Sequence, residues 1–230
     1  MNKALITGSS KGIGLAIAKK LLQDSWTVVG CARTWPEPME GTFIPYTLDL
    51  ANLDTLPDHL TVLQKLHADL SLLICNVGKG LFGSVEEFSY TQMRSLIDLN
   101  FLSNAYFVKA FIPLFKQRRH GHVIFIGSES ALQGKRMGSL YSASKFALRG
   151  FAQALHEECA SSHIRVTTIH PGMVQTPFFD SLSFRPGNHD SEHLEAEDVA
   201  SLVMYILHAR DGMVFEEISL SPQKHRILKQ

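Results

Sequence analysis

Apolar residues along the chain alternate between short continuous runs and longer stretches with helical spacing. Continuous apolar runs of four to six residues are typical of parallel strands buried on both faces. The runs that predict strands are Lys3–Thr7, Thr27–Cys31, Thr42–Tyr46, Leu70–Cys75, His122–Ile126, Arg165–Ile169 and Met213–Ile218. The stretches that predict helices are Ile13–Gln23, Leu53–Leu66, Thr91–Leu99, Phe101–Gln117, Tyr141–Ser161 and Glu197–His208. This alternation predicts an α/β fold, a doubly wound sheet of about seven parallel strands with helices on both faces.

The same pattern predicts a single domain over residues 1–230, because no repeat, linker or low-complexity tract interrupts it. The long irregular stretch, at about 172–195, contains Pro177, Pro186, Gly187 and Asn188. Loops of this length in compact domains usually serve a function. We therefore expect this segment to form a substrate loop.

A glycine-rich turn follows the first predicted strand and opens the first predicted helix. It reads Thr7-Gly8-Ser9-Ser10-Lys11-Gly12-Ile13-Gly14. In this context Gly8 permits a tight turn, Gly12 lets the backbone approach a diphosphate, and Gly14 keeps the helix close to the sheet. The turn predicts a Rossmann-like dinucleotide site, in which the helix N-terminus faces the phosphates. The expected binding residues are Thr7, Gly8, Ser10, Lys11, Gly12, Ile13 and Gly14; a tight turn without a ligand is the alternative.

The end of the second strand indicates which dinucleotide is bound. An acidic residue there typically accepts hydrogen bonds from the ribose of NAD, whereas an arginine accommodates the additional phosphate of NADP. The segment Gly30–Thr34 has no acidic residue and contains Arg33. Together with Lys11, Arg33 predicts a pair of cations around a 2′-phosphate, so NADP(H) is favoured over NAD(H). Two solvated cations at the rim of the site are the alternative.

Tyr141 and Lys145 lie four residues apart on a predicted helix and therefore share one face. An ammonium beside a phenol lowers the pKa of the phenol towards working pH. A tyrosine of this kind can donate a proton to a carbonyl oxygen or accept one from an alcohol. The pair, downstream of a dinucleotide turn, predicts hydride transfer.

These residues together resemble the short-chain dehydrogenase/reductase family in its compact, single-domain form. The glycine turn is similar to the family's Thr-Gly-x-x-x-Gly-x-Gly, and Tyr141 and Lys145 are similar to its Tyr-x-x-x-Lys. Ser128 stands thirteen residues before Tyr141, where the family has its catalytic serine. The resemblance implies that Tyr141 is the general acid/base, that Ser128 stabilises charge on the substrate oxygen, and that Asn100 holds a water in a proton relay. It also implies that Lys145 holds the nicotinamide ribose as well as depressing the pKa of Tyr141.

Further segments carry the same resemblance. Pro171-Gly172-Met173-Val174-Gln175-Thr176 is similar to the family's Pro-Gly-x-x-x-Thr stretch beside the nicotinamide, and Asp49-Leu50 to its adenine-contacting pair. One segment departs from the pattern: Cys75-Asn76-Val77-Gly78 stands where the family has Asn-Asn-Ala-Gly. The implied cofactor contacts are Asp49, Leu50, Asn76, Gly78, Tyr141, Lys145, Pro171, Gly172, Val174 and Thr176. Thr176 as a helix cap and Asn100 as a helix-junction residue are the alternatives for two of the positions.

Composition excludes several other classes. Lysine plus arginine equals aspartate plus glutamate at 22 each, so no net charge favours nucleic acid or an anionic membrane. No apolar run approaches the roughly 20 residues needed to cross a bilayer. The three cysteines have no CxxC spacing, and no histidine spacing predicts a metal site. We expect a cytoplasmic protein with reduced thiols.

The predicted function is an NADP(H)-dependent oxidoreductase acting on a small-molecule carbonyl or alcohol. A non-catalytic, NADPH-sensing regulator on the same fold is the main alternative, and an isomerase or dehydratase a smaller one. For the substrate, Met137, Met173, Phe178, Phe179 and Leu182 suggest a partly apolar cavity. Lys135, Arg136 and Arg185 leave room for a carboxylate, and the tail Val214–Pro222 loosely resembles that of family members acting on 3-hydroxy acids and small carbonyls.

Apolar residues on more than one face of two predicted helices indicate an assembly. These are Phe107, Phe111 and Phe115 on the first helix, and Phe146, Leu148, Phe151 and Leu155 on the second. A single stripe is enough to pack a helix against a sheet, so the surplus needs a second partner. In the resembled family these helices pair across a two-fold axis, and we expect a homodimer or homotetramer.

Overall fold

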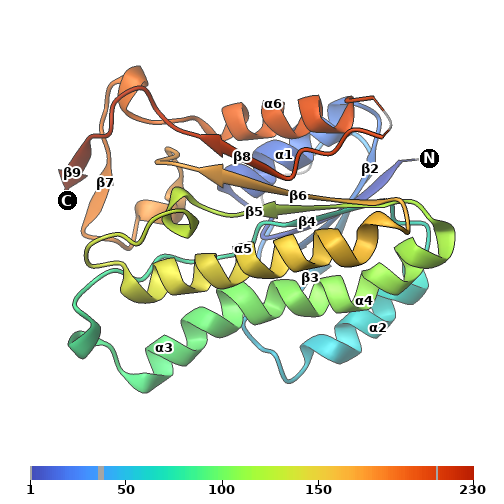
Figure 1. Cartoon of the computed structure of the whole chain (residues 1–230), viewed down its shortest axis with the longest axis horizontal. Coiled ribbons are helices and arrows are strands. Elements are labelled where there is room, and N and C mark those ends of the chain that lie inside the picture. The colour runs from blue at the N-terminus through green and yellow to red at the C-terminus, as the bar shows by residue number, and fades with distance from the viewer. Residues whose placement is uncertain (1, 36–38, 211) are drawn as a thin grey trace.

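A parallel sheet forms the centre of the computed structural model, which describes residues 2–35, 39–210 and 212–230 (Figure 1). Its strands are β1 (Lys3–Thr7), β2 (Thr27–Ala32), β3 (Phe43–Thr47), β4 (Leu72–Cys75), β5 (Gly121–Ile126), β6 (Ile164–Pro171) and β8 (Glu217–Leu220). Their spatial order is β3-β2-β1-β4-β5-β6-β8. Every neighbouring pair is parallel. The predicted seven-stranded, Rossmann-like sheet is confirmed.

The strand order reverses between β1 and β4. From β1 the chain steps outward to β2 and β3, and then returns across β1 to place β4 on its other side. Loops leaving the carboxyl ends of β1 and β4 therefore run in opposite directions and leave a crevice between them. In open α/β sheets, ligands bind at this switch point. The glycine turn and the segment around Asn76 both lie there.

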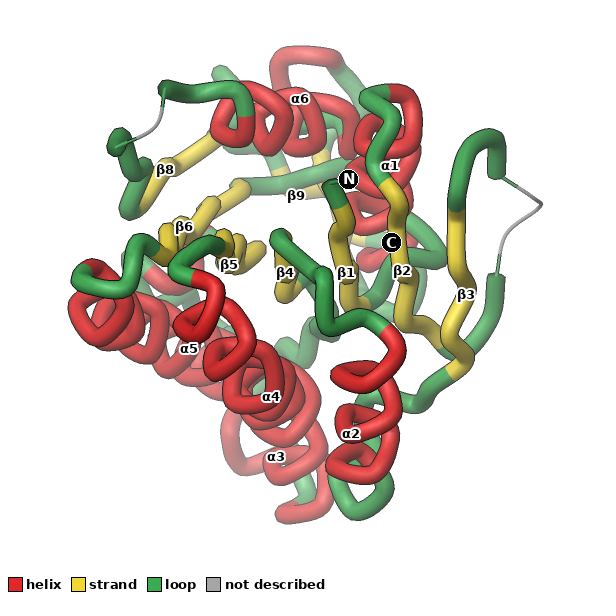
Figure 2. The backbone as a smooth tube through the Cα atoms, turned by 90° about the vertical axis from the view of Figure 1, so that its right-hand side faces the viewer, coloured by secondary structure: helices red, strands yellow, loops and turns green. Residues whose placement is uncertain are grey.

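Helices cover both faces of the sheet (Figure 2). The helices are α1 (Gly12–Gln23), α2 (Leu56–Leu66), α3 (Tyr90–Ile97), α4 (Ser103–Arg118), α5 (Ser139–Ala160) and α6 (Ala196–Leu207). One hydrophobic core joins α1 and α6 to the sheet, and a second joins α2, α4 and α5 to the opposite face (Figure 1). A helix combining the length and the hydropathy needed to cross a membrane is absent from the described part of the chain.

The junction expected at Asn100 is a π-helical turn, Asp98–Leu102, between α3 and α4. The extra residue in such a turn rotates the side chains that follow it relative to those that precede it. Asn100 is fully buried within this turn. The π turn therefore directs Asn100 inward, towards α5.

The chain after β6 contains more regular structure than its pattern predicts. Residues expected to form an irregular loop at 172–195 include two short 3₁₀ turns, Pro177–Phe179 and Asp190–Glu192, and the strand β7 (Phe184–Pro186). That strand pairs antiparallel with β9 (Ile227–Lys229). Three-residue strands contain too few positions to display a period, so no sequence pattern indicated this pairing.

Two sequence-based expectations were wrong in detail. The last strand of the main sheet is Glu217–Leu220 rather than Met213–Ile218. The reason is that Phe215 packs against Tyr205 of α6, with ring centroids 5.9 Å apart, instead of joining the ladder. The second correction concerns α4, because Phe107, Phe111 and Phe115 are each 0% exposed within one chain. Their side chains form the monomer core and are not available to a second subunit.

Candidate active site

The glycine turn adopts a backbone conformation that only glycine tolerates easily. Gly8 and Gly12 have φ angles of 69° and 55°, in the left-handed region. A Cβ atom on Gly14 would lie 2.3 Å from the carbonyl oxygen of Gly8. These glycines therefore bring α1 close to the end of β1 and leave the backbone of the turn uncovered.

Asn76 braces this turn from the end of β4. Its Nδ2 donates to the carbonyl oxygens of Thr7 and Gly8, both at 3.0 Å. The hydroxyl oxygen of Thr7 in turn accepts the backbone N–H groups of Asn76 and Val77 at 3.0 and 3.1 Å. Both side chains were expected to contact a cofactor, but their polar atoms are engaged inside the protein. They shape the crevice by holding its two walls together.

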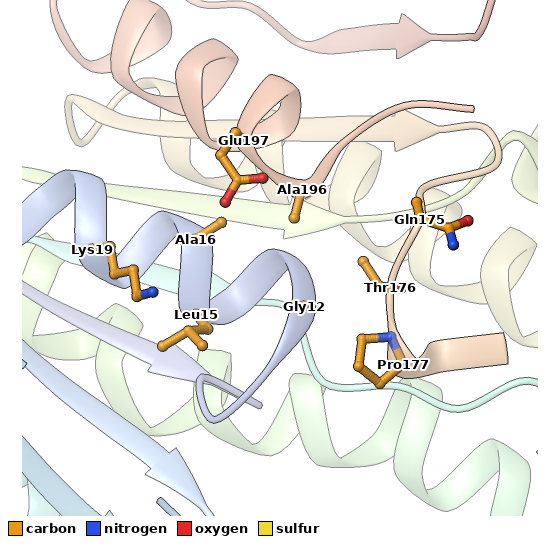
Figure 3. A pocket seen from close by; sticks show the side chains of 9 residues that line it. All are labelled: Gly12, Leu15, Ala16, Lys19, Gln175, Thr176, Pro177, Ala196 and Glu197. Carbon is orange, nitrogen blue, oxygen red and sulfur yellow. The ribbon is translucent and has the colours of Figure 1, made fainter. Parts of the chain in front are cut away.

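The residues at this crevice fit a dinucleotide. Helix α1 begins without a side-chain cap and without an acidic residue in its first turn, so its N–H groups and positive dipole end are directed at the turn. A cavity of about 220 Å³ lies beside it, between α1, the start of α6 and the segment Gln175–Pro177 (Figure 3). In addition, the buried hydroxyl of Ser9 has no hydrogen-bond partner within the described chain. Uncapped N–H groups beside an open space are what a diphosphate requires.

The other residues predicted to bind the diphosphate and adenosine parts of the cofactor lie around the same edge of the sheet. Arg33 and Lys11 are both exposed, and neither forms an ion pair within the described residues. Asp49 follows β3, and its Oδ1 accepts the backbone N–H of Ala51 at 3.0 Å. Leu50 is buried in the core at 4% exposure, so its side chain faces away from the crevice. Of the turn residues, Ser10 and Ile13 are partly buried, and Ile13 packs against the core of α1 and α6.

Tyr141 lies near the start of α5 with only 7% of its surface exposed. Burial raises the pKa of its phenol to about 12, and a hydrogen bond with Ser128 acts in the opposite direction. The neighbouring carboxylate of Glu129 also raises this pKa. The lowering expected from Lys145 is not found: burial dominates, and Tyr141 holds its proton at neutral pH.

Lys145 occupies the next turn of α5 and is also buried, at 5% exposure. Its Nζ lies 5.9 Å from the centre of the Tyr141 ring and donates to the carbonyl oxygen of Ile126 at 3.1 Å. Burial lowers the pKa of this ammonium to about 8. A Cβ on Gly78 would lie 3.7 Å from the same Nζ, so the backbone of Gly78 approaches it closely. Lys145 thus places a charged donor between Tyr141 and the crevice.

Asn100 joins the loop after β4 to α5. Its Oδ1 accepts the N–H of Lys79 at 2.9 Å, while its Nδ2 donates to the carbonyl oxygen of Lys79 and to the hydroxyl of Ser144, both at 3.0 Å. Its own carbonyl oxygen accepts from Asn104 at 3.0 Å. The side chain is therefore engaged, and Asn100 connects the loop after β4 to α5.

Ser128 follows β5, and its backbone is held by a residue that the sequence reasoning missed. The Nδ1 of His170 donates to the carbonyl oxygen of Ser128 at 3.2 Å. A Cβ on Gly127 would lie 2.6 Å from that Nδ1, so glycine leaves the room that the imidazole fills. Behind it, Arg149 of α5 forms a bidentate pair with Glu217 of β8, with contacts of 2.9 to 3.1 Å. These contacts are visible only in the structure, because the residues lie far apart in the sequence and no periodic pattern relates them.

The Pro171–Thr176 segment closes the crevice from the side of β6. The N–H of Gly172 donates to Leu220 at 2.7 Å, and Val174 is buried at 5% exposure. Thr176 caps the 3₁₀ turn that follows it, with its hydroxyl accepting the N–H of Phe178 at 3.4 Å. The same side chain would lie 3.3 Å from a Cβ on Gly12. This segment and the glycine turn therefore face each other across the crevice.

The structure thus brings a serine, a tyrosine and a lysine together at the carboxyl end of the sheet, beside a turn that fits a diphosphate. The sequence profile of the short chain dehydrogenases matches residues 2–185. The chain belongs to the short-chain dehydrogenase family. Members of the family are oxidoreductases that act on alcohol and carbonyl groups, and this chain is one of them.

Two curated relatives illustrate the similarity. The chain is 31% identical to the chicken dehydrogenase/reductase SDR family member 11 over 251 residues, which covers 95% of each protein. It is 35% identical to human retinol dehydrogenase 8 over 184 residues, covering 76% of this chain and 59% of that protein. The chain therefore spans less than two thirds of the length of the second relative.

Solved structures share the fold. An alcohol dehydrogenase from Thermococcus sibiricus, complexed with 5-hydroxy-NADP, superimposes with a TM-score of 0.86 at 24% identity, covering 98% of this chain and 99% of that one. ElxO with NADP bound gives a TM-score of 0.84 at 22% identity, covering 96% and 97%. At these identities the similarity establishes the architecture alone.

Proposed function

We propose that the protein is an NADP(H)-dependent reductase or dehydrogenase in which Tyr141 is the general acid/base. The observation that carries this proposal is the buried phenol of Tyr141, which lies near enough to Ser128 for that side chain to lower its pKa and whose ring centre is 5.9 Å from the ammonium of Lys145. A regulator that only senses the cofactor has no physical need for all three groups. The bound reduced nicotinamide would supply a hydride, and the remaining requirements are met by side chains of this chain.

In the reductive direction these side chains have distinct tasks. Ser128 donates a hydrogen bond to the carbonyl oxygen and stabilises the negative charge that develops there. Tyr141 donates its proton to the same oxygen, and a phenol with a pKa raised to about 12 is fully protonated and ready for this step at neutral pH. Lys145 holds a positive charge beside the phenol, which stabilises the phenolate left behind. Its remaining N–H groups are available to the ribose of the cofactor.

The preference for NADP(H) rests on charge at the end of β2. Arg33 and Lys11 are exposed beside the crevice, and the segment Gly30–Thr34 has no carboxylate to bind a ribose hydroxyl. A 2′-phosphate would form charge-assisted hydrogen bonds with both cations. Several solved structures of the same fold are complexes with NADP or 5-hydroxy-NADP, which agrees with this preference.

We also infer that the protein forms a homodimer or homotetramer through α5. The phenylalanines of α4 lie in the core, so the surface available to a partner is that of α5, where Phe146 is 42% exposed. Small residues share this exposed surface of the helix, namely Ala143, Ala147, Gly150 and Ala154. A flat helical face with one protruding aromatic ring suits packing against a second copy across a two-fold axis.

The experiment that tests the catalytic proposal is Tyr141→Phe, which removes one oxygen atom and leaves the ring in place. Loss of the general acid should lower turnover of a responsive carbonyl substrate by about 10²–10⁴-fold, followed through NADPH absorbance. NADPH binding, measured by calorimetry, should persist. Tyr90→Phe is the matched control, because Tyr90 is 90% exposed and lies on α3, away from the site. Retention of most activity by Tyr141→Phe would exclude Tyr141 as the acid.

A further inference from the structure

Two phenylalanine rings pack near the ring of Tyr141. The centroid of the Phe82 ring lies 5.0 Å from that of Tyr141, and the Phe178 ring lies 6.0 Å from it. Two further rings extend the cluster, since Phe184 packs 4.9 Å from Phe82 and Phe179 packs 5.1 Å from Phe178. The four phenylalanines come from the loop after β4, the 3₁₀ turn after β6, and β7. They form an aromatic wall beside the proton donor.

This aromatic wall is held in place by the backbone around it. A Cβ on Gly80 would lie 3.0 Å from both the Phe82 and the Phe178 rings, so the rings pack directly against the loop. At the far end, Nε2 of Gln230 donates to the carbonyl oxygens of Phe179 and Leu182, both at 2.7 Å. Phe184 belongs to β7, and its backbone is held by the antiparallel pairing of β7 with β9. The wall is therefore a built surface rather than a set of independent side chains.

A carboxylate side chain, that of Glu129, lies close enough to Tyr141 to raise its pKa, and it disfavours a substrate carboxylate beside it. Glu129 follows Ser128, and its Oε2 lies 3.3 Å from the Cβ position of Gly172, beside the cofactor crevice. Two of the three cations that the sequence offered to a carboxylate are engaged elsewhere, and the third, Arg136, is exposed to solvent. Lys135 pairs with Glu129 itself at 3.5 Å, and the guanidinium of Arg185 donates to Asn188. A substrate carboxylate bound beside Ser128 would therefore lie close to the like charge of Glu129, which disfavours it.

We propose that the substrate is an uncharged carbonyl compound whose aromatic or similarly flat apolar group stacks against Phe82 and Phe178, and that Glu129 excludes carboxylate-bearing substrates. The proposal rests on the proposed reductase function. In the reaction the C=O π bond breaks and the carbonyl carbon accepts a hydride from NADPH, which is oxidised to NADP⁺. The oxygen accepts the phenolic proton of Tyr141, so the product is the alcohol. Offset stacking of an aromatic group on such a wall adds about 0.5–1.5 kcal/mol per ring pair to its burial.

The first test compares methyl 4-formylbenzoate with 4-formylbenzoate, which share the ring and the aldehyde and differ in charge. The wild-type enzyme should have a kcat/KM at least tenfold higher for the ester. In Glu129→Gln this ratio should shrink several-fold, whereas any change in the pKa of Tyr141 acts on both substrates alike and cancels in the ratio. Because the intrinsic reactivity of the two aldehydes is unchanged by the substitution, the change in the ratio reports the charge of Glu129 alone.

The second test addresses the aromatic wall. Phe82→Leu and Phe178→Leu keep an apolar side chain and remove a ring, so each should lower kcat/KM for the ester about tenfold more than kcat/KM for propanal. Tyr205→Leu is the matched control, because Tyr205 is an aromatic residue of α6 that is 66% exposed. In this control variant, the ratio of kcat/KM for the ester to kcat/KM for propanal should equal that of the wild type. A purely structural defect would lower both substrates together.

The outcomes separate this inference from the function on which it rests. Equal kcat/KM for the acid and the ester, or a ratio unmoved by Glu129→Gln, would overturn the exclusion by charge and leave the reductase assignment standing. Equal losses for the ester and propanal in the two phenylalanine variants would overturn the role of the wall. Absence of NADPH oxidation with all three aldehydes would overturn both the inference and the proposed function.

Discussion

A buried lysine costs the folded protein stability, and Lys145 makes that cost measurable. Burial lowers its pKa from 10.5 to about 8. Each pH unit by which a pKa changes is worth about 1.36 kcal/mol, so carrying the charge at neutral pH costs the folded state about 3 kcal/mol. Against this, the hydrogen bond from Lys145 to Ile126 contributes about 1 kcal/mol. Lys145→Met should therefore stabilise the cofactor-free protein by about 2 kcal/mol at pH 7.

The pH dependence gives this prediction a definite sign. Between pH 8 and 10.5 the unfolded chain binds the lysine proton and the folded chain does not, so rising pH favours folding of the wild type. The free-energy cost of burying the charged Lys145 ammonium is fully present below pH 8 and disappears above pH 10.5. The advantage of Lys145→Met should consequently shrink over this window and reverse at its upper end, where only the lost hydrogen bond remains.

The assay is urea unfolding of wild type and variant at pH 7 and pH 10, without cofactor, because a ligand held by Lys145 would stabilise only the wild type. Lys109→Met is the matched control, since Lys109 is an exposed lysine of α4 and its removal should change stability little at either pH. Lys145→Met should at the same time lose most of its activity. Destabilisation at pH 7, or a difference that does not change with pH, would refute the reasoning.

Three further predictions concern the cofactor, the glycine turn and the assembly. Arg33→Asp should weaken NADPH binding at least tenfold more than NADH binding by calorimetry, and a wild-type preference for NADH would contradict the assignment. Gly14→Ala forces a Cβ to 2.3 Å from the Gly8 oxygen and should destabilise the protein by at least about 2 kcal/mol, whereas Gly134→Ala, with nothing within 4 Å, should not. Phe146→Glu should dissociate the assembly in light scattering without lowering Tm, while Val62→Glu, at 44% exposure on α2, should not; a monomeric wild type would exclude the assembly.

The sequence alone determined the order of the elements and the positions that approach the cofactor crevice. Continuous apolar runs identify buried parallel strands because both faces of the sheet are covered, and six of the seven predicted strands overlap their observed positions closely. Gly8, Gly12 and Gly14 were identifiable because the turn demands positive φ angles and close approach, which leave glycine as the suitable residue. Tyr141 and Lys145 were identifiable because helix geometry places residues four apart on one face.

Only the tertiary structure decided contacts that have no period in the sequence. His170 reaches Ser128 across 42 positions, and Gln230 reaches Phe179 across 51. Burial, which sets the pKa of Tyr141 and of Lys145, depends on neighbours from several strands and loops rather than on local spacing. For the same reason the phenylalanines of α4 looked available to a partner, although the facing core already covers them. The spacing of residues in the sequence predicts local structure. Desolvation and long-range contacts arise only when distant segments pack together.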